Sequence, residues 1–107
     1  MAEGGRIDFE QATDGELWAR LPARVVADSE INATAVRVYA ALMIAGVRAG
    51  VRGEPGYQGQ EALGEECGEV SVSTVSRAME ALEEAGYIST ERVGLGQPDN
   101  ITIHRLP

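Results

Sequence analysis

Apolar residues recur at helical spacing over the longest patterned segment of this 107-residue chain, from residue 33 to about residue 50. Asn32 stands directly before the segment and is a residue type that favours the N-cap position. The apolar positions repeat every three or four residues and fall on one face. They are Val36, Tyr39, Ala40, Met43 and Val47. The pattern predicts a long, mostly buried helix.

Two shorter helices are predicted after it, at residues 60–67 and 72–85. Leu63 and Cys67 face inward on the first of them, and Gly68 fits the left-handed position that ends a helix. Ser71 is suited to cap the second. The second helix carries an apolar stripe made of Val75, Ala78, Met79 and Leu82.

The two ends of the chain follow other patterns. Residues 87–93 and 101–107 alternate apolar and polar positions across a glycine-proline turn, which predicts a β-hairpin. Residues 1–15 are polar and are expected to form a loose arm before a domain at 16–107. The start of that domain is an apolar lead-in, expected to pack on the domain with a short helical turn after Pro22. Its apolar residues are Leu17, Trp18, Leu21, Val25 and Val26.

The order helix, helix, tight turn, helix and hairpin resembles a winged helix-turn-helix domain. It is most similar to replication-initiator-like and phage or plasmid regulators. The matching residues are Leu21-Pro22, Val38-Tyr39, Gln60-Glu61-Ala62-Leu63, Val70-Ser71, Thr74-Val75, Arg77, Leu82-Glu83 and Gly86-Tyr87-Ile88. The resemblance implies an α+β, mostly α fold of three helices with a C-terminal β-hairpin wing. Gly59, Gly64 and Glu69 depart from the pattern. They suggest a weaker helix cap, a closer helix crossing and one extra residue in the turn, respectively.

The resemblance also implies sequence-specific binding of double-stranded DNA by a transcriptional regulator or a replication or partition factor. The third helix would enter the major groove through its N-terminal half. The candidate DNA-binding residues are Ser71, Ser73, Thr74, Ser76 and Arg77, with Gln58, Gln60 and Arg92 near the DNA backbone. A structural alternative stays open, in which Ser71 and Thr74 only cap the helix and Arg77 pairs with Glu80 or Glu84.

The charge of the chain runs against DNA binding. The net charge is −8, from 17 acidic residues and nine basic residues that are all arginine. Many of the acids fall in the half of the chain expected to meet DNA, whereas proteins that neutralise phosphates carry basic surfaces. A second hypothesis therefore stays open: an acidic winged helix that binds a protein partner, as an adaptor or a decoy that mimics DNA. If the chain does bind DNA, a homodimer would supply more cations, and the long helix with the lead-in around Trp18 is the expected contact.

Functions other than DNA or protein binding find little support in the sequence. No nucleophile has a plausible base, and no phosphate-binding glycine loop or ligand cluster occurs, so neither an enzyme, a metal site nor a cofactor is expected. Cys67 is the single cysteine and is expected to be a small core residue. No run approaches 18 apolar residues and the start of the chain lacks an apolar signal segment, so we expect a cytoplasmic protein with no membrane partner.

Overall fold

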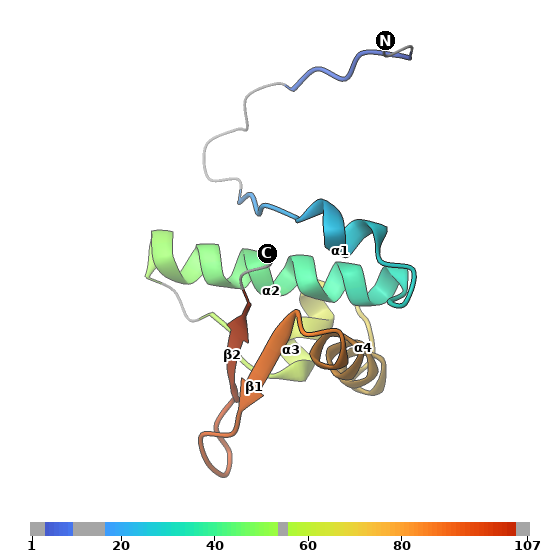
Figure 1. Cartoon of the computed structure of the whole chain (residues 1–107). Coiled ribbons are helices and arrows are strands. Elements are labelled where there is room, and N and C mark those ends of the chain that lie inside the picture. The colour runs from blue at the N-terminus through green and yellow to red at the C-terminus, as the bar shows by residue number, and fades with distance from the viewer. Residues whose placement is uncertain (1–3, 10–16, 54–55, 105–107) are drawn as a thin grey trace.

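A computed structural model describes residues 4–9, 17–53 and 56–104, with the side chain of Arg52 excepted. Within these ranges the fold is α+β and mostly helical, with four helices and a two-stranded antiparallel hairpin (Figure 1). The elements are α1 (Ala23–Ala27), α2 (Ala33–Arg52), α3 (Gln60–Glu66), α4 (Val72–Glu84), β1 (Ile88–Glu91) and β2 (Asn100–Ile103). The predicted helical turn after Pro22 is α1. Parts of the predicted arm, residues 1–3 and 10–15, lie outside the described residues.

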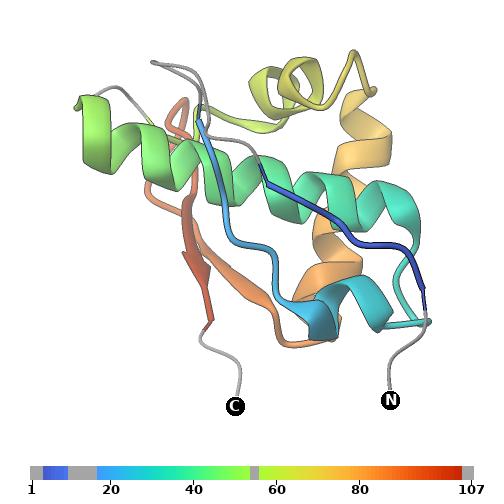
Figure 2. The same ribbon diagram turned by 90° about the horizontal axis from the view of Figure 1, so that it is seen from above.

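Helix α2 is the element on which the others pack. The Asn32 side chain accepts a hydrogen bond from the Ala35 N–H at 2.8 Å, as its predicted capping role requires. The helix runs two residues beyond the predicted end and stops at Gly53, whose φ of +67° is a left-handed conformation. The lead-in and α1 lie on one side of α2, and α3, α4 and the hairpin lie on the other (Figure 1). Seen from above, α2 crosses the whole molecule (Figure 2).

The core forms where α4 crosses α2. The predicted stripe of α4 is buried as expected. Tyr39, Val38, Val75 and Leu82 are among the side chains most completely removed from solvent, and each contributes roughly 1.5–3 kcal/mol of transfer free energy. Tyr39 also packs edge-to-face on Tyr87, with ring centroids 6.2 Å apart. The contact of α4 with α2 therefore fixes the direction of α4.

The hairpin closes the remaining side of the core. Ile88 pairs with Ile103, and Thr90 pairs with Ile101. Directly opposite residues share one face of an antiparallel pair, so these isoleucines all face the helices. Ile88 is buried, and Ile101 and Ile103 pack against the core from its edge.

The lead-in packs less completely than the sequence predicted. Of its apolar side chains, Val25 is fully buried, whereas Trp18 is 57% exposed and Val26 58% exposed. Leu21 is also exposed. Val25 lies on the single inward face that a helix of five residues can offer.

Helix α2 is also apolar enough to meet a simple criterion for a membrane span. Residues Ala33–Val51 form a 19-residue stretch with a mean hydropathy of 1.3. The expectation concerned an uninterrupted apolar run, which Arg37 and Arg48 prevent here. The stretch meets the criterion through its average hydropathy, to which alanine and the bulkier apolar residues contribute. The same helix supplies Ala35, Val38, Tyr39, Leu42 and Ala45 to the buried core, which is the packing of a core helix.

A hydrogen bond joins α1 to the start of the hairpin. The Tyr87 hydroxyl donates to Asp28 Oδ2 at 2.5 Å, and the Glu30 N–H donates to Asp28 Oδ1 at 2.8 Å. The bond from Tyr87, followed by that from Glu30, lowers the pKa of the Asp28 carboxyl. The same bond, with burial, raises the pKa of the Tyr87 phenol.

Tyr87→Phe should lower the urea midpoint of unfolding at neutral pH by removing this bond. The contribution of Asp28 is complete above its unfolded pKa of about 3.9 and is lost as pH falls through the lower folded value. The contribution of Tyr87 is complete below about pH 10 and is lost as pH rises through its raised folded value. The difference in midpoint between wild type and variant should therefore be constant near neutrality and shrink at both extremes. A difference that does not change with pH would contradict the assignment.

The turn between α3 and α4 brings Gly64 against Val70. The Val70 N–H donates to the Gly64 carbonyl at 2.9 Å, and a Cβ at position 64 would overlap the Val70 carbonyl oxygen. Gly64 thus allows a close approach between α3 and the turn before α4, which a side chain at this position would prevent. The chain then reverses through Gly68 at φ +89° and Glu69 at φ +66°. Glu69, expected as an extra turn residue, is the one described non-glycine residue with a positive φ, a conformation that costs roughly 1–2 kcal/mol.

Gly64→Ala should destabilise the fold by about 1–3 kcal/mol, because the carbonyl that it meets is backbone and cannot move aside. Gly46→Ala is the matched control. Gly46 lies inside α2 with no atom within 4 Å of an added Cβ, so alanine should stabilise the helix there by about 0.5–1 kcal/mol. Equilibrium unfolding in urea measures both changes. Equal effects of the two variants would show that the contact with Val70 does not constrain the turn.

Candidate nucleic-acid interface

The N-terminus of α4 is organised by a network of hydroxyl groups. Ser71 Oγ accepts a hydrogen bond from the Thr74 N–H at 3.3 Å and donates to Thr74 Oγ1 at 2.9 Å. Ser73 Oγ lies 3.3 Å from Ser71 Oγ. The capping role considered for Ser71 and Thr74 is thus present in the structure. Ser71 and Ser73 are both exposed, and Ser73 takes no part in capping the helix.

Arg77 stands one turn further along the exposed face of α4. Its Nε donates to the Ser73 carbonyl at the long distance of 3.5 Å. Its expected pairing with Glu80 or Glu84 is absent, since no carboxylate of the described residues lies within 4.0 Å of the Arg77 guanidinium. Glu80 therefore does not hold the Arg77 side chain in place in this structure. Ser76, on the neighbouring position, is half-buried.

The start of α2 lies beside this face and was not identified from the sequence. Thr34 lines one surface hollow with Arg77 and a second with Arg37. Arg37 Nη1 also donates to the Cys67 carbonyl at 3.3 Å, next to the turn before α4. Arg37 lies on the long helix next to its apolar positions. The sequence carries no local signal that Arg37 lies near Arg77, because the two arginines become neighbours on the surface only where α2 crosses α4.

The two glutamines near the start of α3, Gln58 and Gln60, have different surroundings. Gln58 is exposed. The Gln60 side-chain amide donates to Met79 Sδ at 3.9 Å, and the Tyr57 hydroxyl donates to the same sulfur at 4.0 Å. Gln60 is therefore directed toward the core, and Gln58 is the residue that remains available for contact near the start of α3.

The hairpin loop offers one cation among its described residues. Arg92 is exposed and lines a shallow hollow of the loop with Gly94, Leu95 and Gln97. Leu95 is fully exposed. The loop extends away from the helices, and it lies on the same side of α2 as α4 (Figure 1). Arg92 and α4 thus share one side of the molecule.

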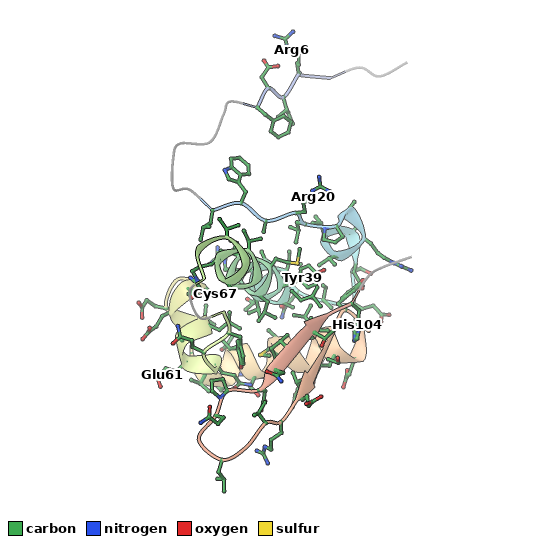
Figure 3. All side chains as sticks on the ribbon, turned by 90° about the vertical axis from the view of Figure 1, so that its left-hand side faces the viewer. Arg6, Arg20, Tyr39, Glu61, Cys67 and His104 are labelled. Carbon is green, nitrogen blue, oxygen red and sulfur yellow. The ribbon has the colours of Figure 1, made fainter. Side chains whose placement is uncertain are left out.

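The acidic side chains of this region are mostly exposed. Glu66 forms an ion pair with Arg48 at 2.7 Å, and Glu83 accepts a hydrogen bond from Thr90 at 2.6 Å. The remaining glutamates from residue 61 to residue 91 are exposed without a described ion pair. They are Glu61, Glu65, Glu69, Glu80, Glu84 and Glu91, and Figure 3 shows Glu61 pointing outward from α3.

Cys67 belongs to the core rather than to this surface. Its side chain is 3% exposed, as predicted for a small core residue, and burial raises the pKa of its thiol. Among the described residues no group of three or more histidine, cysteine, aspartate or glutamate side chains could hold a metal ion.

Comparison of the chain with protein-family models, with curated proteins and with solved structures found no match.

Proposed function

We propose that this chain is a winged helix-turn-helix protein that binds a specific sequence of double-stranded DNA. Its size and element order favour a small transcriptional regulator, or a replication or partition factor, of phage or plasmid type. The observation that carries the proposal is the N-terminal half of α4, which stands exposed at the end of a tight turn with Ser73 and Arg77 on its solvent face. The succession of α2, α3, α4 and a hairpin is the order of elements in that fold.

Each group on this surface has a distinct role in the proposal. Arg77 would donate two hydrogen bonds to one guanine in the major groove or bind a phosphate. Ser73 is small enough to let α4 approach the bases closely. Arg37 and Thr34, at the start of α2, would contact the phosphate backbone. Arg92 would do the same from the hairpin. The N-terminus of α4 adds a partial positive charge that favours phosphate.

The charge of the chain limits how such binding can work. A net charge of −8 repels DNA at long range, so non-specific affinity should be low. Among the described residues of the proposed surface, three guanidinium groups could neutralise phosphates, those of Arg37, Arg77 and Arg92. Specific contacts in the groove would therefore have to supply a large share of the binding free energy.

A second candidate function rests on the exposed glutamates. Six of them lie between residues 61 and 91 without a described ion pair. An acidic surface of this kind suits a protein partner with a basic groove, for which the chain would act as an adaptor or as a decoy that mimics DNA. Binding of a purified basic DNA-binding domain, without affinity of the chain for DNA itself, would favour this candidate.

Arg77→Ala should weaken specific DNA binding by about 1–3 kcal/mol, because it removes the cation on the exposed face of α4. The target is a duplex selected from a random library by the wild-type protein, and fluorescence anisotropy measures its affinity. Arg6→Ala is the control, since it removes the same charge from the N-terminal arm. If both variants bind the selected duplex like wild type, α4 does not read the groove.

Glu80→Gln should strengthen both specific and non-specific DNA binding. Glu80 is exposed on α4, makes no described ion pair and would repel phosphates near the groove. Affinity for the selected duplex and for a scrambled duplex is compared at two salt concentrations, and the gain should shrink at the higher one. Weaker specific binding by the variant would instead restore a positioning role for Glu80.

A further inference from the structure

A cavity lies between α2, the hairpin and the segment that leads into α3. Its volume is about 340 Å³, within the range of roughly 300–1,000 Å³ that small-molecule sites occupy. Figure 1 shows β2 rising toward α2 beside that segment. Residues from all three parts of the chain line the cavity, among them Leu42, Gly46, Tyr57, Asp99 and Ile101. We call it the hairpin cavity.

Part of the wall of the hairpin cavity is apolar. Leu42 of α2 is buried, and Ile101 of β2 is half-buried against the core. Gly46 adds no side chain to this wall, and a Cβ built on it would meet no atom within 4 Å. Gly46 thus leaves space that a larger residue would occupy. A ligand that fits this part of the wall has an apolar body.

The described residues that line the hairpin cavity include one charged side chain, that of Asp99. Asp99 is half-buried, and no cation of the described residues forms an ion pair with its carboxylate. Arg92 lines a neighbouring hollow with Asp99, yet the two side chains do not pair. The carboxylate therefore carries a negative charge that its described surroundings in the cavity leave unbalanced. It attracts a cation and repels an anion.

Tyr57 adds an aromatic ring to the same cavity. Its hydroxyl donates to Met79 Sδ at 4.0 Å, which ties the side chain to the core. Burial, followed by the negative charge of Asp99, raises the pKa of the Tyr57 phenol, so the side chain stays neutral at physiological pH. Tyrosine rings attract cations placed over their faces. Tyr57 and Asp99 thus favour the same sign of charge on a ligand.

We propose that the hairpin cavity binds a small organic cation. Its ammonium group lies at the Asp99 carboxylate beside Tyr57, and its apolar body lies against Leu42 and Ile101. A water molecule takes up about 30 Å³ in the liquid, so the cavity has room for a ligand of roughly ten non-hydrogen atoms. The ligand contacts α2 and the hairpin together and stabilises their packing.

Three probes with one aromatic body and different charges test this assignment. Phenethylamine is a cation at neutral pH, phenethyl alcohol is neutral and phenylacetate is an anion. Each is titrated into the full chain while the backbone amide resonances are followed by two-dimensional NMR. With the amine, the resonances of Gly46, Tyr57 and Asn100 should shift together and saturate. The amine should bind at least about tenfold more tightly than the alcohol, and phenylacetate should bind more weakly than either.

Two variants test the two parts of the site. Gly46→Leu should weaken binding of the amine at least about tenfold, because the new side chain fills the cavity. Gly50→Leu is the matched control, since Gly50 also lies on α2 with no atom within 4 Å of an added Cβ but does not line the cavity. Asp99→Asn should remove the preference for the amine over the alcohol. Glu84→Gln, which removes an exposed acid from α4, should leave that preference unchanged.

The outcomes that contradict the proposal are distinct. Titration with the amine that produces no saturable shift would overturn it. Equal affinity for the three probes would also overturn it, because the cavity would then accept the apolar body without regard to charge. Amine binding that Gly46→Leu leaves unchanged would place the probe elsewhere on the protein and reject the site. None of these measurements involves DNA, so their outcome is independent of the proposed function.

Discussion

The packing of α4 against α2 is the interaction on which the rest of the structure depends. Val75 and Leu82 of α4 are fully removed from solvent, as is Val38 of α2. The hairpin and α1 attach to this pair through Tyr87, which packs on Tyr39 and donates to Asp28. Loss of the α2–α4 contact would leave the hairpin and the lead-in without a surface to pack on, and it would free α4 from its direction.

The same contact decides which groups α4 can present. With one stripe of α4 buried, Ser73 and Arg77 are left on the solvent face, and the crossing of α2 places Arg37 and Thr34 beside them. The tight turn at Gly64 and Val70 sets where α4 begins. The crossing of α2 over α4 and the turn at Gly64 and Val70 therefore fix the relative positions of the hydrogen-bond donors on this surface.

Elements with a strong local signal were predictable from the sequence. Asn32, Ser71 and the stripe at Val75, Met79 and Leu82 behave as expected, because capping and helical periodicity act over a few residues. Three features were not predictable, two because they depend on distant parts of the chain and one because it depends on a side-chain rotamer. They are the exposure of Trp18, the place of Arg37 beside Arg77, and the lack of an ion pair between Arg77 and Glu80. Spacing of three residues permits such a pair, but the rotamer of Arg77 decides whether it forms.

The salt dependence of DNA binding by the wild-type chain is the measurement that tests the central claim most directly. Binding to the selected duplex and to mixed genomic fragments is measured across salt concentrations. Arg37 and Arg92 would face phosphates, and Arg77 would face either a phosphate or a guanine. The logarithm of the association constant should therefore fall against the logarithm of salt concentration with a slope of about −2 to −3 per bound chain. A selected duplex should also bind more tightly than mixed fragments at every concentration. The absence of any DNA complex at low salt, where phosphate contacts are strongest, would contradict the account.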